Sequence, residues 1–233
     1  MIRPLLPLLA GAICFTGCVE VRNGPTEHES RVIPRDASKS LRVDLRMGAG
    51  TLRVSGGSDQ LLVGDFTYNV PDWKPDVRYK STETRGTLSI EQLGRHHTTI
   101  GRMRYEWNLR LNDDVPTDLN VNFGAGEAKL DVGSLYLRVV EVNMGVGQLV
   151  LDLRGTPRHD YEVHIQGGVG EATVRLPANV GVSARGSGGI GSIEVRGLHK
   201  EGSRWINDAY DSSKTQIRVD VSGGIGSIKL IAE

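Results

Sequence analysis

The chain has 233 residues, and its 28 basic and 28 acidic side chains give a formal net charge of zero. This length suits one domain, or one and a half, and the charge balance gives no electrostatic reason to expect nucleic acid as a partner. Thirty glycines, 5% aromatic and 24% charged residues indicate a globular protein enriched in turns.

The first eighteen residues have the features of a secretory signal. One positive charge, Arg3, precedes an apolar run from Leu5 to Phe15 that is too short and too interrupted by proline to span a bilayer well. The segment ends in Phe15-Thr16-Gly17-Cys18, which resembles a bacterial lipobox, where small residues precede a cysteine that becomes the lipidated N-terminus. We therefore predict a lipoprotein signal peptide over residues 1–18 and a lipid on Cys18.

Two other interpretations of this segment stay open, namely an ordinary signal peptide and an uncleaved anchor. Cys14 is a poor rival for lipidation because Ile13 stands where a small residue is needed. Lipidation at Cys18 would remove Cys14 and leave the mature protein with neither a free thiol nor a disulfide. Val19 follows the cysteine, and the lack of Asp there favours the outer membrane if the host has two membranes.

The next two segments are predicted to be a tether and a cap. Residues 19–40 are polar, contain two prolines and show no periodicity, which predicts a flexible tether. Residues 41–115 begin with one copy of a repeat, and the rest alternate like strands separated by turns. We predict a first coil followed by inserted antiparallel β-hairpins that cover its side or end, because an open coil presents unpaired backbone.

Aromatic and histidine residues in the cap region were candidates for a binding site. Trp73, Tyr105 and Trp107 are expected in the core of the cap rather than in a ligand platform. His96 and His97 stand in a polar segment with no obvious third ligand, so a solvated loop is expected there rather than a metal site.

Residues 116–233 repeat the glycine motif of the first coil, Gly-X-Gly followed by alternating apolar positions. The glycine pairs are Gly48 and Gly50, Gly124 and Gly126, Gly145 and Gly147, Gly168 and Gly170, Gly189 and Gly191, and Gly224 and Gly226. From Gly124 onward the first glycines lie 21, 23, 21 and 35 residues apart, and the last interval contains an insertion at 199–215. A period near 21 with glycine at fixed positions predicts a solenoid.

Aligned copies predict which residues face the core. Five positions of the repeat are apolar in nearly every copy. They stand five and three residues before the first glycine, between the two glycines, and four and six residues after the first glycine. This alternation predicts strands with one buried face. The expected fold is therefore all-β, a parallel β-solenoid like a single-stranded β-helix. Its glycine corners allow unusual φ and leave room for the neighbouring coil.

The outward positions carry polar side chains that would stack between copies. Amides and hydroxyls stand two residues before the first glycine in the last five of the six copies, and opposite charges face each other if successive copies are neighbours. The expected pairs are Glu141 with His164, Asp152 with Arg175, and Arg185 with Asp220. The insertion could disturb the last pair.

The repeated hexapeptide GGIGSI resembles the start of a calcium-binding nonapeptide, G-G-x-G-x-D. The position of the required Asp is taken by Ile193, Ile228 or Ala172, so we predict no calcium site. A phosphate loop is also not expected, because no helical pattern and no Lys-Ser/Thr pair follow the glycines. No metal and no cofactor are therefore predicted.

The segment from Tyr105 to Gly155 resembles the toast-rack domain of bacterial envelope proteins, which are related to the putative-adhesin family and to the C-terminal domain of LiaF-like cell-wall stress regulators. Matching features include the coil from Gly124, LPANVGV from Leu176 and WINDAY from Trp205. The resemblance extends from about Leu41 to the C-terminus. It implies a β-solenoid with no known catalytic residues and a largely unassigned role.

Two classes of function fit these features. We predict a non-catalytic, lipid-anchored module of the cell envelope that acts in interaction or scaffolding, in envelope stress response or adhesion. Its partners would be the membrane, through Cys18, and an unidentified envelope protein or cell-wall polymer. The alternative is a polysaccharide-binding or polysaccharide-degrading β-helix protein. An enzyme of that class needs carboxylates converging on one groove, whereas the outward charges here alternate in sign.

Overall fold

The computed structural model describes residues 21, 22, 24–94, 99, 100 and 103–233. The predicted signal peptide, the lipidation site Cys18, and His96 and His97 lie outside the described residues. The described part is all-β apart from the 3-10 turn η1 (Pro71–Trp73), as predicted. It contains no helix long and apolar enough to cross a bilayer.

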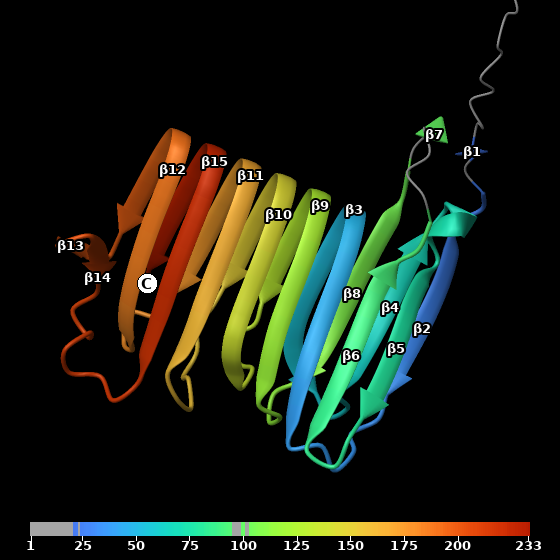
Figure 1. The fold of residues 1–233 in the computed structure, drawn as a ribbon, viewed down its shortest axis with the longest axis horizontal. Helices are drawn as coiled ribbons and strands as arrows, with labels where there is room; N and C mark the ends of the chain where they lie inside the picture. The colour runs from blue at the N-terminus through green and yellow to red at the C-terminus, as the bar shows by residue number, and fades with distance from the viewer. Residues whose placement is uncertain (1–20, 23, 95–98, 101–102) are drawn as a thin grey trace, which may run out of the picture.

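Six long strands, one for each glycine motif, form the body of the protein (Figure 1). In spatial order they are β3 (Ser40–Ser58), β9 (Thr117–Asp131), β10 (Leu137–Asp152), β11 (Tyr161–Leu176), β15 (Gln216–Ala232) and β12 (Gly181–Arg196). Each strand bends at its Gly-X-Gly corner, and all six pair in parallel. The halves before the corners form what we name the first wall, and the halves after them form the second wall, with the apolar core between.

The order of the strands corrects one prediction. Successive copies are neighbours from β3 to β11, but β15 lies between β11 and β12, so the fourth and fifth copies do not touch. The connection over residues 177–180 is long enough to cross two strand spacings, about 10 Å, so the chain can leave a gap. The hairpin of β13 (His199–Glu201) and β14 (Arg204–Ile206) pairs with the outer edge of β12 before β15 returns to fill that gap.

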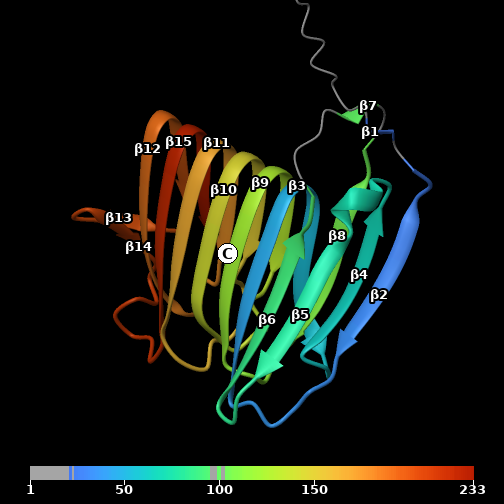
Figure 2. The same cartoon turned by 45° about the vertical axis from the view of Figure 1, so that its right-hand side comes forward.

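The cap extends both walls at the β3 end (Figure 2). On the first wall, β6 (Arg85–Gln92) pairs with the first half of β3, and β5 (Pro75–Ser81) pairs with β6. On the second wall, β8 (Tyr105–Asn112) pairs with the second half of β3, followed by β4 (Leu62–Tyr68) and β2 (Glu27–Ile33). Among the described residues, the short strands β1 (Val21–Arg22) and β7 (Thr99–Ile100) pair only with each other.

Strand β2 corrects the predicted tether. Residues 27–33 form a strand instead of an unpaired segment, because all seven pair with β4. Nearly every side chain of this edge strand is exposed on both faces, so its sequence carries no apolar alternation, and its position is set by backbone pairing. A side-chain hydrogen bond from Ser30 to Asp65, 2.6 Å long, adds to it.

The aromatic residues of the cap lie in the core, which confirms that prediction. Trp107 is fully buried, and Tyr105 and Trp73 are almost so. The Trp107 ring meets Phe66 edge-on with centroids 5.8 Å apart, and Tyr105 meets Trp73 in the same way at 5.6 Å. Such contacts close this end of the core with large side chains.

Candidate functional site

The glycine corners bring the two walls together along one edge of the molecule. The second glycine of every pair has a positive φ, which is +144° at Gly170. A Cβ added at Gly170 would overlap the carbonyl oxygen of Gly147 on the neighbouring strand, and one added at Gly168 would overlap that of Gly145. Both the bend and the close stacking therefore require glycine here.

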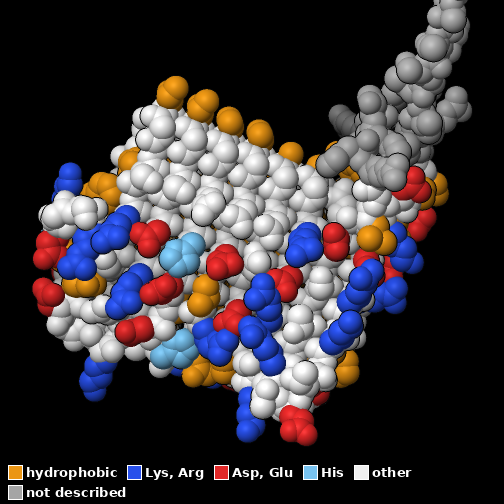
Figure 3. Space-filling view, viewed as in Figure 1, with side chains coloured by type: hydrophobic (Ala, Val, Ile, Leu, Met, Phe, Trp, Pro, Cys, Tyr) orange, Lys and Arg blue, Asp and Glu red, His pale blue; other side chains and the backbone are white. Residues whose placement is uncertain are grey.

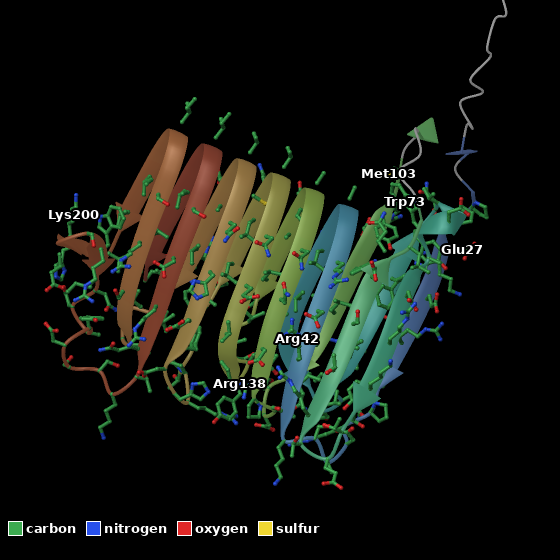
Figure 4. All side chains as sticks on the ribbon, in the orientation of Figure 1. Glu27, Arg42, Trp73, Met103, Arg138 and Lys200 are labelled. Carbon is green, nitrogen blue, oxygen red and sulfur yellow. The ribbon has the colours of Figure 1, made fainter. Side chains whose placement is uncertain are left out.

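The residues between the paired glycines project into solvent, and we name this row the corner ridge. In spatial order it consists of Ala49, Ala125, Val146, Val169, Ile225 and Ile190, each opposite the next in the strand register. Figure 3 shows apolar side chains along this edge, and Figure 4 shows them pointing away from the walls. Neighbouring strands are about 4.8 Å apart, so the six residues extend over about 24 Å.

The ridge overturns the predicted inward position of these six residues. Val146 is 55% exposed and Ile190 is 72% exposed. Residues that point inward stand one, three and five positions before the first glycine of a pair, but four and six positions after it. The alternation of inward and outward residues therefore changes phase at the corner. The residue at the change of phase, between the glycines, points outward. The aligned sequence columns already contained this signal.

A band of neutral polar side chains borders the ridge on the first wall. It consists of Asn122, Asn143, Gln166, Ser222 and Ser187, the predicted ladder of amides and hydroxyls. The Asn143 amide donates to Asn122 Oδ1 at 3.2 Å. Figure 3 shows this uncharged band below the apolar edge and the charged side chains farther down.

The second wall carries acidic residues close to the ridge. Glu127 and Glu171 each stand two residues after a ridge residue. Lys229 Nζ donates to Glu171 at 2.9 Å and Ser227 donates at 3.3 Å. The hydrogen bond from Lys229 is the main reason why the pKa of Glu171 is lowered, so this carboxylate is a paired surface group.

A small apolar cavity of about 110 Å³ lies under the ridge at the β12 end. The inward position just before the corner holds Met47, Phe123 and Met144 in the first three strands of the stack. In the last three it holds Gly167, Gly223 and Gly188, so no side chain fills the space. Glycines make up much of the cavity lining, and Ile165 and Ile228 are among its aliphatic side chains.

The two ends of the stack differ. At the β3 end, Gln92 Oε1 accepts hydrogen bonds from the backbone amides of Gly48 and Ala49 at 2.7 and 3.1 Å. At the β12 end, only Ser183 and Ala184 pair with β14. Within the part of the chain that the structure describes, no strand pairs with the outer edge of residues 185–196.

The predicted cross-strand registers are found, but the ion pairs partly differ. Register pairs are Glu141 with His164, Asp152 with Arg175, and Arg185 with Asp220, so the insertion does not disturb the last pair. The closest partner of Asp152 is Arg154, whose Nε donates at 2.9 Å.

The pKa of Asp152 reflects a balance of burial and pairing. Burial alone would raise this pKa, but hydrogen bonds from Arg154, together with the charges of Arg154 and Arg175, outweigh it and lower the pKa. The carboxylate is therefore held in its charged form. The described residues contain no group of three or more His, Cys, Asp or Glu side chains able to hold a metal ion.

Comparison with known families identifies the fold. Residues 22–175 match the family described as the N-terminal domain of toast_rack, DUF2154. The chain belongs to the toast-rack family. Residues 125–230 of this toast-rack chain also match the family described as cell wall-active antibiotics response LiaF, C-terminal. None of the curated proteins matches it in sequence.

Among solved structures, the toast-rack chain is similar to a "putative cell adhesion protein" from Clostridium sporogenes. The two are 31% identical, with a TM-score of 0.84, over 89% of this chain and 100% of that one. A "putative adhesin" from Bacteroides fragilis is 9% identical, with a TM-score of 0.36, over 90% of this chain and 99% of that one. The second is too divergent to support an inference about this chain.

Proposed function

We propose that this toast-rack protein is a non-catalytic interaction module of the cell envelope, held at a membrane by a lipid on Cys18. Membership of the toast-rack family, the match to a LiaF domain and the similarity to a protein described as a cell adhesion protein support this proposal. The lipobox-like Phe15-Thr16-Gly17-Cys18 supports the anchor, and Val19 supports the outer membrane in a host with two membranes.

The observation that carries the proposal is the regular outer face of the first wall. Between β9 and β12 the same polar side-chain types recur on parallel strands about 4.8 Å apart. Below them, oppositely charged side chains face each other across strands, as Arg218 and Glu162 do at 3.2 Å. Such a face suits contact with an extended partner, either an envelope protein or a cell-wall polymer, in adhesion or in an envelope stress response.

The anchor is tested by fractionating cells that produce full-length variants. Cys18→Ala should move the protein from the membrane fraction to the soluble fraction, because a lipid is the main attachment. Cys14→Ala is the matched control and should leave the protein in the membrane fraction. Wild-type membrane retention of the Cys18→Ala protein would contradict the anchor.

The interaction face is tested by photo-crosslinking in intact cells. A crosslinking residue at Gln166, in the middle of the first wall, should trap a protein or a cell-wall polymer. The same residue at Thr156, in the exposed loop between β10 and β11, should not. Equal crosslinking at both positions, or release of soluble sugars from the trapped polymer by the purified protein, would argue against a non-catalytic wall-binding module.

A further inference from the structure

The corner ridge is the most exposed apolar feature of the described residues. Val146, Val169, Ile225 and Ile190 expose 55, 44, 52 and 72% of their surface in one continuous row. Single exposed aliphatic residues are common, but an ordered row of them marks a contact surface. Side-chain size also rises along the stack, from Ala at the cap end to Ile at the β12 end.

The N-terminal end of the described chain lies at the same edge as the ridge. The backbone amide of Gly24 donates to Asn69 O at 2.8 Å, directly after β4. Tyr68, the last residue of β4, pairs with Tyr105, and the Tyr105 carbonyl lies against the glycine corner at Gly50. Figure 4 places Trp73 and Glu27 beside the ridge end of the cap, and Figure 2 places β1 and β7 there.

Covalent geometry then limits where a membrane anchor can be. Gly24 stands six positions after Cys18, and a fully extended chain covers at most about 3.6 Å per residue, or about 22 Å in total. Each wall is about 25 Å high from the ridge to the opposite loops. A lipid on Cys18 therefore keeps the bilayer away from the loops opposite the ridge.

We propose that the corner ridge rests on the lipid surface to which Cys18 anchors the chain, an inference that depends on the proposed lipid anchor. The acyl chains would hold the cap end of the stack at the membrane. Ile225 and Ile190 would hold the far end there, about 24 Å away along the stack. Two attachments at opposite ends fix the orientation of the walls. The first wall then stands upright from the membrane and presents its polar face sideways.

The charges beside the ridge limit the depth of this contact. Glu127 and Glu171 lie two residues from the ridge on the second wall, and burial of their carboxylates in hydrocarbon would be costly. The neutral band on the first wall has no such restriction. The aliphatic tips of the ridge therefore enter the boundary between headgroups and acyl chains and go no deeper.

The test uses full-length lipidated protein with one labelled cysteine. Lipidation occupies Cys18 and processing removes Cys14, so a cysteine introduced by Ile190→Cys or Ile225→Cys can be labelled selectively. The label is an environment-sensitive fluorophore, and the vesicles contain phosphatidylethanolamine, phosphatidylglycerol and a nitroxide lipid. Label at either position should be quenched several-fold more strongly than label at Thr156→Cys in the opposite loops.

A second measurement asks whether the isoleucines cause the contact. With the label at Val169→Cys, the added substitutions Ile190→Ser and Ile225→Ser should reduce quenching several-fold. Val32→Ser is the matched control, because Val32 is 55% exposed, close to the 52% of Ile225, but lies on β2, and it should leave quenching unchanged.

Three outcomes would overturn the proposal. Equal quenching at positions 190 and 156, with the protein in the membrane fraction, would leave the anchor intact and disprove the ridge contact. A blue-shifted but unquenched label at 190 would mean that a protein covers the ridge. Wild-type protein in the soluble fraction would disprove both the anchor and the ridge contact.

Discussion

The side-chain oxygen of Gln92 accepts a hydrogen bond from the backbone amide of Gly48 at 2.7 Å. A Cβ added at Gly124 would meet the carbonyl oxygen of Gly48, and a Cβ added at Gly48 would meet Gln92 Oε1 at 3.3 Å. The Gln92 amide therefore takes the place that a neighbouring glycine corner occupies elsewhere in the stack. This contact closes the corner at the cap end, where the solenoid stops.

Gln92→Leu should lower the free energy of unfolding by about 1–3 kcal/mol, because it leaves the amides of Gly48 and Ala49 without their acceptor in a partly buried position. Gln92→Glu keeps an acceptor oxygen and should cost less. Urea denaturation of the two variants measures the difference. Equal stability of Gln92→Leu and wild type would show that water replaces the side chain at no cost.

Asp152 should make the unfolding free energy of the protein depend on pH in the acidic range. Its pKa is lowered in the folded state, so its contribution is present above the unfolded value near 3.9 and is lost as pH falls through the lower folded pKa. Wild type should therefore exceed Asp152→Asn in unfolding free energy at neutral pH, and this difference should shrink on acidification below about pH 4. A difference that stays constant down to pH 2 would contradict the lowered pKa.

Much of the stack could be predicted from the sequence, because identical positions recur. The glycine pairs indicate the corners, and the offsets from them place Asp152 opposite Arg175, as the structure has it. The preferred partner of Asp152 could not be found this way. Arg154 lies two residues away on the same face of the chain, and its planar guanidinium can reach both carboxylate oxygens.

The repeat pattern does not predict two other features of the fold. The position of β15 between β11 and β12 depends on which gap the chain leaves open, and both arrangements keep the glycines and the apolar core positions opposite each other. Strand β2 has no buried face, so apolar periodicity could not reveal it. The corner ridge, in contrast, is encoded in the change of phase at each Gly-X-Gly corner, although its apolar residues by themselves predict burial.

The cavity under the ridge predicts a stabilising substitution. A Cβ added at Gly223 would meet only Ile228 side-chain atoms, at 3.5 Å or more, and the residue does not have a positive φ. Gly223→Ala should therefore raise the free energy of unfolding by about 0.4–1 kcal/mol, since alanine restricts the unfolded chain. Chemical denaturation measures the gain. A loss of stability would mean that the walls close over the cavity in solution.

The stacking of the corners is tested most directly at Gly170, in the middle of the ridge. Gly170 has φ of +144°, and an added Cβ would overlap the backbone carbonyl of Gly147, which cannot move without separating β10 from β11. Gly170→Val should therefore lower the free energy of unfolding by several kcal/mol, on the order of 4–5. Gly188→Ala is the control in the same region, because an added Cβ there meets no atom within 4 Å and the backbone does not have a positive φ. Its stability should equal that of wild type or slightly exceed it, for the same reason as at Gly223. If Gly170→Val were tolerated as well as Gly188→Ala, the strands could not be stacked as closely as their register requires, and the ridge would lose its rigid base.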